Sequence, residues 1–311
     1  MEFHHQPVLL QEVLEALQVR EDGVYVDGTA GGGSHSAAIA SRLTTGRLIA
    51  LDRDPDAIKA ASQKLAPYPQ AQVVRANFDQ MDSVLQSLGI DGADGILMDL
   101  GVSSHQLDTP ERGFSYHNDA PLDMRMSQEG RSAKDLVNGL EADELSRIFF
   151  DYGEERYARS IARAIVKARQ EAPIETTLQL ADIIKYAMPP AARREQGHPA
   201  RRCFQALRIA VNGELDHLEQ GLVHAFSCLK EGGRMAIITF HSLEDRMVKR
   251  QFAKWAKGCI CPSDFPVCVC GHMPEATLVW RKAVEASPEE LEQNPRSRSA
   301  KLRAIVKTTT G

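Results

Sequence analysis

An apolar segment that ends on an acid and runs into a cluster of glycines constrains this chain most. The sequence Val-Tyr-Val-Asp-Gly-Thr-Ala-Gly-Gly-Gly-Ser-His-Ser occupies residues 24–36. Glycine lets a backbone turn sharply and approach a ligand closely because it has no side chain. A second apolar segment, 47–51, leads into Asp52. An acid about 20 residues after such a turn meets a ribose hydroxyl in nucleotide-binding βαβ units. The pattern predicts a protein built around an adenosine-containing cofactor.

Strand-like and helix-like patterns alternate through the first hundred residues. Strands are predicted at 24–26, 47–51, 71–75 and 94–100. Helices are predicted between them at 36–42, 55–65 and 81–88. Strands that alternate with helices form a parallel sheet covered by helices on both faces. The sequence therefore predicts an α/β fold with a mostly parallel, Rossmann-like sheet.

The alternation stops after residue 100, and the next clear strand, 234–240, comes more than 130 residues later. Because one crossover needs about 30 residues, most of this span is expected to be an insertion. The insertion is predicted to be helical at 142–150, 154–169, 177–187 and 204–229. The sheet is predicted to resume with a helix at 243–256 and strands at 277–280 and 302–307. We therefore predict a discontinuous sheet domain, 1–108 and 212–311, and an inserted all-helical domain, 109–211.

Charge and hydropathy narrow the class of protein. The net charge of −5 argues against indiscriminate binding of polyanions, although a local basic face can still attract phosphate. No apolar stretch is long enough to span a bilayer, and the polar N-terminus has no signal-peptide pattern. We therefore expect a soluble, cytoplasmic protein that does not enter a membrane.

The glycine cluster departs from the dinucleotide-binding fingerprint. That fingerprint needs glycine at its first, third and sixth positions. Gly31 and Gly33 supply the first two, but Ser36 stands at the third. This disfavours a nicotinamide cofactor, and the absence of a Gly-Lys-Ser/Thr P-loop disfavours a nucleoside triphosphate.

S-adenosylmethionine fits the pattern better. Asp27 and the loop 31–35 would hold its amino-acid end, and Asp52 would accept both ribose hydroxyls. Phe78, after the third strand, could stack on adenine, and Asp99 would project from the fourth strand at the carboxyl edge of the sheet. Each residue also has a structural interpretation, as a helix cap, a core side chain or a turn. Four such positions at the right strand ends favour the cofactor.

Further motifs extend over nearly the whole chain. They occupy residues 5–9, 27–36, 52–54, 99–104, 106–108, 112–115, 121–126, 152–156, 198–200, 204–209, 240–246 and 294–299. With these motifs in this order, the chain resembles the bacterial cytosine-N4 methyltransferases of small-subunit ribosomal RNA, the family called RsmH or MraW.

The resemblance implies a class I Rossmann-like methyltransferase fold interrupted by a helical domain that helps to hold RNA. It implies methylation of the exocyclic N4 of a cytidine in the decoding centre of 16S rRNA, near the ribosomal P site. Naked rRNA and the assembled small subunit both remain open as the substrate, and the decoding-centre target suggests the subunit or a late assembly intermediate. The implied cofactor contacts are Gly33, Ser34, His35, Asp52, Phe78, Asp99 and Gln106. The family commonly has glycine at the position of Ser34, so that contact requires the serine to adopt the necessary dihedrals.

Two acids are candidate catalytic residues. The cytosine amine is a poor nucleophile because its lone pair is delocalised into the ring, so a fixed acceptor for its N–H would promote in-line methyl transfer. Asp99 is the first candidate and Asp123 the second. Asp123 also has a structural interpretation, as a partner of Arg125. Methylation at C5 of cytosine is disfavoured because it typically uses a cysteine in a Pro-Cys or Thr-Cys pair, and neither pair occurs here.

Two basic clusters are candidate contacts for RNA phosphates. The first consists of Arg193, Arg194, Arg201, Arg202 and Arg208. The second includes Arg296, Arg298 and Lys301. The alternative interpretation is that these side chains only solvate the surface.

Four cysteines crowd into one short segment, as Cys259-Ile-Cys261 and Cys268-Val-Cys270. Four thiolates could surround a tetrahedral zinc ion, although the spacing differs from the usual Cys-x-x-Cys knuckle. Zinc, a disulfide pair and reduced thiols all remain open at this point.

Two other functions compete with the methyltransferase. One is a non-catalytic ribosome-assembly factor that binds RNA and keeps a relic cofactor site, and the other is an NAD-dependent oxidoreductase. Retention of Asp27, Asp52 and Asp99 together argues against the first, and Ser36 argues against the second. The oligomeric state does not follow from the sequence.

Overall fold

The computed structural model describes residues 7–194, 197–262, 265, 267 and 269–308. The chain divides into two compact units, a sheet unit of Met1–Gly101 with Asp216–Gly311 and a helical unit of Val102–Leu215. The sequence places the corresponding boundaries after residue 108 and before residue 212. Among the described residues, none of the helices has the length and apolar character that a membrane span requires.

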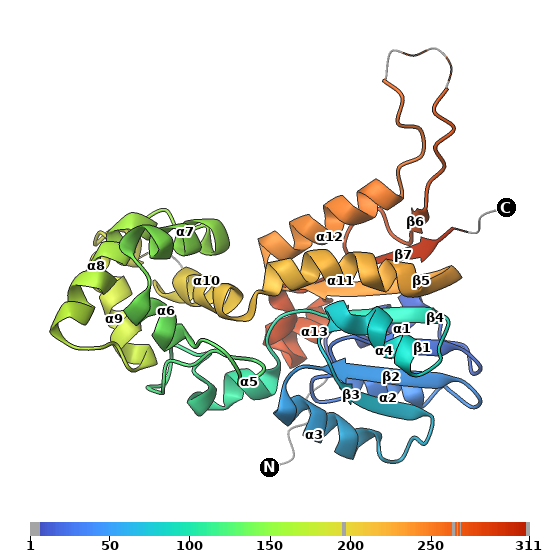
Figure 1. Ribbon diagram of the computed structural model, residues 1–311, viewed down its shortest axis with the longest axis horizontal. Coiled ribbons are helices and arrows are strands. Elements are labelled where there is room, and N and C mark those ends of the chain that lie inside the picture. Colours follow the sequence, from blue (N-terminus) through green and yellow to red (C-terminus); the bar gives the residue numbers. More distant parts are fainter. Residues whose placement is uncertain (1–6, 195–196, 263–264, 266, 268, 309–311) are drawn as a thin grey trace. The chain divides into compact units, whose positions relative to one another are not determined.

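The sheet unit is built on seven strands in the order β3-β2-β1-β4-β5-β7-β6 (Figure 1). The strands are β1 Val24–Asp27, β2 Arg47–Asp52, β3 Ala71–Arg75, β4 Ala93–Asp99, β5 Leu229–Thr239, β6 Ala276–Leu278 and β7 Lys301–Lys307. Strands β3, β2, β1, β4 and β5 pair in parallel, whereas β7 and β6 add antiparallel pairs at one edge. This confirms the predicted mostly parallel α/β sheet.

Alternate strand residues enter two different cores, as the period of a strand requires. Leu48 and Ala50 of β2 lie in one core, and Ile49 and Leu51 lie in the other. The first core is covered by α1 Leu10–Leu17, α2 Ser34–Ala40 and α3 Pro55–Leu65. The second is covered by α4 Met81–Ser87, α11 Glu214–Cys228 and α12 Ser242–Trp255. The sheet unit is therefore a three-layer sandwich.

The helical unit has a core of its own. Its helices are α5 Ser104–Asp108, α6 Ala133–Gly139, α7 Ala142–Gly153, α8 Ala158–Glu171, α9 Thr177–Ala187 and α10 Arg201–Asn212. Their apolar faces meet at fully buried side chains such as Phe149, Ile165 and Leu180. Because these faces bury one another, the unit does not need the sheet to cover its apolar surface.

One predicted helix is wrong. The sequence suggests a single helix at 204–229, but α10 ends at Asn212 and α11 begins at Glu214. Gly213 between them adopts a left-handed conformation, with φ 58° and ψ 32°, and its N–H caps α10 by donating to the carbonyl of Ile209. Glycine reaches this region without steric cost, so the break is encoded at one position within an otherwise helical pattern.

The bounds of other helices and strands differ from the predicted ones. The predicted helix at 154–169 begins only at Ala158, because α7 runs to Gly153 and Glu154 takes a left-handed C-cap conformation. Strand β5 begins earlier than predicted, at Leu229, and its pairing with β4 shifts register before it resumes at Gly95 and Arg234. The sequence patterns also miss α1, α5, α6 and α13 Pro288–Gln293.

Candidate cofactor and catalytic site

Three parallel strands end on aspartates at the same edge of the sheet unit. Asp27 closes β1, Asp52 closes β2 and Asp99 closes β4. Strand β1 lies between β2 and β4, so consecutive strands diverge from it to opposite sides. Open α/β sheets bind ligands beyond the carboxyl ends of their strands at such a switch point. The fold therefore assembles the acids that the sequence singles out.

Asp27 fixes the glycine turn through hydrogen bonds to its carboxylate. Its buried carboxylate accepts hydrogen bonds from the Ser36 hydroxyl at 2.6 Å and from the Thr29 N–H at 3.1 Å. Burial raises the pKa of Asp27, and these two hydrogen bonds oppose that shift. Ser36, where a dinucleotide-binding turn would have its third glycine, thus tethers α2 to the end of β1.

The turn itself depends on Gly33, which precedes α2 with φ 77° and ψ 15°. Ser34 follows as the first residue of α2 and is not among the described residues with positive φ. The serine therefore meets no steric penalty where the family commonly has glycine. Its hydroxyl accepts a hydrogen bond of 2.7 Å from the Lys64 ammonium.

Asp52 is held by backbone donors. One carboxylate oxygen accepts the N–H of Gly31 at 2.8 Å, and the other accepts the N–H of Asp54 at 2.9 Å. Burial raises the pKa of Asp52 to about 6, against the effect of these two bonds. Each oxygen of a carboxylate has a second lone pair, so Asp52 retains acceptor capacity toward a diol.

Asp99 has an unusual environment at the end of β4. Its backbone N–H donates to the Thr29 hydroxyl at 2.6 Å, which fixes the residue against the glycine turn. Within the described part of the chain, its buried Oδ1 has no hydrogen-bond partner. Burial raises the pKa of Asp99 to about 6, because the charges of Asp27 and Glu244 add to the desolvation while His35 opposes it. A buried acceptor without a donor is costly unless a ligand completes it.

His35 is the basic group that faces Asp99. Its Nδ1 lies 3.7 Å from Asp99 Oδ2, and its Nε2 lies 2.9 Å from the carbonyl oxygen of Val8. A carbonyl can only accept, so Nε2 carries a proton. The imidazole ring is thereby oriented by the chain before α1 and directs its other nitrogen at the carboxylate.

Phe78 is placed by both local capping and close packing. It begins a short 3-10 helix, Phe78–Gln80, and Asn77 caps that turn. A Cβ atom on Gly221 of α11 would lie 2.5 Å from the Phe78 ring. Because Cδ2 and Cε2 of the ring lie directly on the backbone of α11, that part of the ring is not available to a base.

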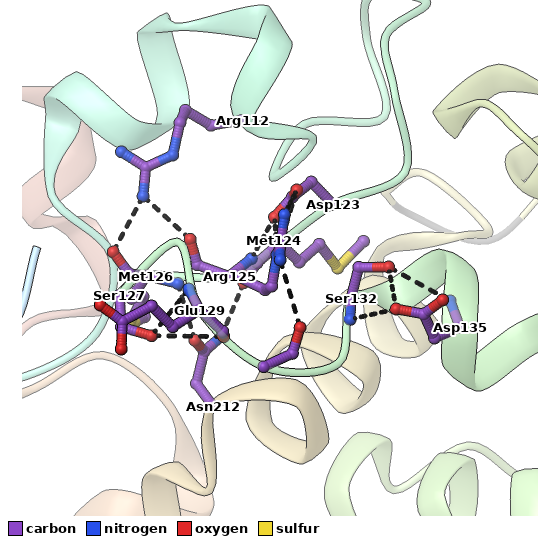
Figure 2. Close-up of polar contacts among 11 residues, drawn as sticks. Arg112, Asp123, Met124, Arg125, Met126, Ser127, Glu129, Ser132, Asp135 and Asn212 are labelled. Carbon is purple, nitrogen blue, oxygen red and sulfur yellow. Dashed lines mark hydrogen bonds and ion pairs between the residues drawn. The ribbon is translucent and has the colours of Figure 1, made fainter.

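Asp123, the second catalytic candidate, is engaged by Arg125 in the helical unit (Figure 2). The Arg125 guanidinium donates to the Asp123 carboxylate from Nη2 at 2.7 Å and from Nε at 3.0 Å, and the Arg125 N–H adds a bond of 2.9 Å. This is the ion pair that the alternative interpretation anticipates. The pair braces the turn at Met124, which has φ 64° although it is not glycine.

Two side chains hold the segment after Asp123 (Figure 2). Asn212 accepts the Met126 N–H at 2.8 Å and donates to the Met124 carbonyl at 2.8 Å. Arg112 donates to the carbonyls of Arg125 and Met126 at 2.9 and 3.0 Å. The sequence reasoning did not identify Asn212 or assign a role to Arg112, because only the fold brings them to this loop.

Gln106, the remaining predicted cofactor contact, belongs to the helical unit. It is buried in α5 and forms a capping box with Ser103, whose N–H donates to Gln106 Oε1 at 2.9 Å. Its role in this structure is therefore at least that of a helix cap.

The first basic cluster divides into braced and exposed arginines. Arg208 forms a two-bond ion pair with Glu214 at 2.8 and 2.9 Å. Arg193 donates to the carbonyls of Met188 and Tyr186. Arg194, Arg201 and Arg202 are exposed, and Arg202 also donates to a backbone carbonyl. The exposed arginines are the ones whose charge is available to a phosphate.

The second basic cluster belongs to the sheet unit. Arg296 and Arg298 are exposed on the 3-10 helix Pro295–Ser299. Lys301, at the start of β7, is partly buried and lies 3.7 Å from Glu285.

The cysteine segment follows α12. The Sγ atoms of Cys259, Cys261 and Cys270 lie within 4.8 Å of one another. Cys268 lies outside the described residues. None of the five described cysteines forms a disulfide.

Known proteins resemble this chain over nearly its whole length. A family model described as the MraW methylase family matches residues 2–308. A protein of Symbiobacterium thermophilum named ribosomal RNA small subunit methyltransferase H is 58% identical, over 100% of this chain and 99% of that protein. Proteins of the same name from Heliobacterium modesticaldum and Geobacter sp. strain M21 are 55% and 54% identical, over 99% and 98% of this chain and 99% of each relative. The resemblance found in the sequence is confirmed, and the chain belongs to the MraW methylase family.

Proposed function

We propose that this methyltransferase uses S-adenosylmethionine to methylate the exocyclic N4 of a cytidine in the decoding centre of 16S rRNA. The observation that carries the proposal is the Asp99 carboxylate, with a raised pKa and a buried oxygen that has no partner among the described residues. The names of the relatives support ribosomal RNA of the small subunit as the substrate.

The strand-end residues fit the proposed cofactor. Asp52 keeps acceptor capacity for ribose hydroxyls, and the exposed part of Phe78 is available to adenine. The backbone at Gly33, Ser34 and His35 would hold the amino-acid end. When bound, S-adenosylmethionine supplies an electrophilic methyl group. The buried, preformed turn under these contacts supports their roles, because a rigid site loses less entropy on binding.

Asp99 acts on the amine in this proposal. The cytosine nitrogen gains a methyl group and must lose one proton to remain neutral. The Asp99 carboxylate, whose side chain is 26% exposed, would accept an N–H of that amine, favour a pyramidal nitrogen whose lone pair is no longer delocalised into the ring, and take the proton. We assign His35 as a positioning residue, because its Nδ1 lies 3.7 Å from the other carboxylate oxygen. An ordered acceptor of this kind contributes about 10²–10⁴-fold to rate.

Asp123 remains a prediction as a catalytic residue, and its ion pair with Arg125 favours a positioning role. Gln106 likewise remains a predicted cofactor contact. Both belong to segments that we propose help to present the cytidine.

Exposed arginines support RNA binding by the helical unit. Arg194, Arg201 and Arg202 would contact phosphates, whereas Arg193 and Arg208 are predicted contacts that also bond within the helical unit. Arg296, Arg298 and Lys301 would add contacts from the sheet unit. A cytosine methylated at its amine must be unpaired or flipped out. We propose that the substrate is the small ribosomal subunit or a late assembly particle in the cytoplasm.

Calorimetry on the intact protein tests the cofactor. We expect saturable binding of S-adenosylmethionine and no binding of NAD. Asp52→Asn should weaken that binding about 10- to 100-fold, because a charge-assisted hydrogen bond is lost. Asp91→Asn changes an exposed acid and serves as the matched control. Saturation by NAD in place of S-adenosylmethionine would overturn the proposal in favour of an oxidoreductase.

Transfer of a labelled methyl group tests the reaction. We expect label in 16S rRNA or small subunits and none in 23S rRNA. Binding of RNA and cofactor without transfer would favour a non-catalytic assembly factor.

A further inference from the structure

The segment between α12 and β6, residues 256–275, is a long connection. In the described part of this segment, the chain forms neither a helix nor a strand. Figure 1 shows its two arms running alongside each other away from α12 and β6. Long connections without secondary structure are uncommon in compact domains and usually have a function.

Apolar burial does not hold these arms together. Large apolar side chains are exposed along the segment: Ile260, Phe265, Val267, Val269 and Met273. Side chains that stay in water contribute little of the free energy that burial supplies. Ordering so many residues costs conformational entropy, so another interaction must offset that cost.

Sulfur atoms meet where the arms face each other. Cys270 Sγ lies 3.8 Å from Cys259 Sγ, and Cys261 Sγ completes a group within 4.8 Å. A disulfide would bring two sulfurs to about 2.05 Å. Two thiolates on a tetrahedral zinc ion, each with a Zn–S bond of about 2.3 Å, lie about 3.8 Å apart. The observed spacing matches the edge of a metal–thiolate tetrahedron.

Backbone N–H groups point at the same sulfurs. The N–H groups of Ile260 and His272 each approach Cys270 Sγ at 3.4 Å, and the N–H of Val269 approaches Cys261 Sγ at 3.4 Å. Backbone donors of this kind surround ligand atoms in the outer shells of metal sites. The contacts cross between the arms, since Ile260 lies on one and Cys270 on the other.

His272 connects the two arms of the segment. Its Nδ1 lies 2.7 Å from the carbonyl oxygen of Gly258, on the opposite arm. The carbonyl can only accept, so Nδ1 is the donor. The cysteine cluster is therefore ordered by contacts on both sides, independently of any apolar core.

We propose that Cys259, Cys261 and Cys270 form a structural site for a thiophilic divalent cation, with zinc as the ion it takes. Three thiolates occupy three positions of a tetrahedron, and a further ligand fills the fourth. Soft sulfur donors select zinc over magnesium or calcium. On binding, the three thiols release their protons to solvent, and the ion clamps the two arms of the segment.

Metal analysis of the full-length protein tests the site. The protein is purified under reducing conditions without a metal-binding tag, and its metal content is measured by mass spectrometry. We expect about one zinc ion per chain. Cys259→Ser, Cys261→Ser and Cys270→Ser should each lower this content at least about tenfold. Cys228→Ser, which changes a partly buried cysteine of α11, is the matched control and should keep the zinc.

Two further measurements guard against misfolded variants. Cobalt substitution should give the thiolate charge-transfer and tetrahedral d–d absorption bands, and these should be lost in Cys270→Ser but not in Cys228→Ser. A chelator should speed proteolysis within 256–275 while the melting temperature of the sheet unit stays unchanged. The proposal would be overturned if the wild-type protein, incubated with zinc and then desalted, kept no zinc. Intact-mass evidence for disulfides among these cysteines would also overturn it.

Discussion

The Nδ1 atom of His35 lies 3.7 Å from Oδ2 of Asp99, while its Nε2 is committed to the carbonyl of Val8. The imidazole ring therefore faces the carboxylate in one orientation. Asp99 Oδ1 is buried and lacks a partner among the described residues, while the side chain as a whole stays 26% exposed. We propose that the exposed part of this carboxylate is the acceptor for an incoming amine.

Methyl transfer should require the ionised form of Asp99. Burial raises the pKa of Asp99 to about 6, so a protonated carboxyl group blocks the reaction below that pH. The single-turnover rate should fall about tenfold per pH unit below about pH 6 and level off above it. Saturating S-adenosylmethionine is needed because the pKa of Asp52 is also raised to about 6. Asp99→Asn should be slower by about 10²–10⁴-fold, and a profile without an inflection in the wild type would contradict the assignment.

The same buried charge should lower the stability of the cofactor-free protein. The pKa of Asp99 is about 6 in the folded state and about 3.8 in the unfolded state, so the penalty is present above about pH 6 and is relieved as the pH falls toward 4. Asp99→Asn should therefore raise the free energy of unfolding by about 1–3 kcal/mol near neutral pH, and the gain should vanish near pH 4. Chemical denaturation at the two pH values measures the difference.

Asp94 provides a control for that experiment, because its pKa is shifted in the opposite direction from that of Asp99. Burial alone would raise its pKa, but the Val24 N–H and the ion pairs with Lys230 and Arg20 lower the pKa overall. Asp94 thus stabilises the fold above its unfolded pKa and loses that effect as the pH falls. Asp94→Asn should lower stability near neutral pH, and a gain there in place of a loss would contradict the electrostatic account.

RNA binding should depend on the exposed arginines of α10. Arg201→Ala combined with Arg202→Ala should weaken binding of 16S rRNA and reduce the slope of log K against log salt by about 1–2, since each lost phosphate contact removes about one unit. Arg42→Ala, an exposed arginine at the end of α2, is the control. Filter binding across a salt series measures the slope, and unchanged slopes would show that these arginines only solvate α10.

Asn212 should be critical for the loop that carries Asp123. Asn212→Ala removes three hydrogen bonds, to the Met126 N–H and to the carbonyls of Met124 and Arg208, at a buried position. Leaving such groups unpaired should lower the stability of the helical unit by about 2–4 kcal/mol. Asn212→Asp keeps the acceptor for the Met126 N–H but sets a buried carboxylate oxygen against the carbonyls of Met124 and Arg208, so it should lower stability at least as much. Unfolding monitored by hydrogen exchange in α10 compares the variants, and an unchanged Asn212→Ala would refute the bracing role.

Local patterns were sufficient to predict the sheet and the acids at its edge. Short apolar runs mark the strands, and Asp27, Asp52 and Asp99 stand where those runs end. The break at Gly213 was not predictable, because one glycine inside a helical pattern is usually tolerated. Asn212 and Val8 form hydrogen bonds with residues far away in the sequence, so no local pattern marks them. The sequence offered the Asp123–Arg125 ion pair only as an alternative, and the position of the Arg125 side chain shows that pair.

The most direct measurement is nucleoside analysis of small-subunit RNA after reaction with isotopically methyl-labelled S-adenosylmethionine. Small subunits from a strain that lacks the enzyme are incubated with the wild-type protein or with Asp99→Ala, and their 16S rRNA is digested and analysed by mass spectrometry. We expect labelled N4-methylcytidine with the wild type and a loss of that product with Asp99→Ala. Label in 5-methylcytidine, or an equal yield of N4-methylcytidine from both proteins, would contradict it.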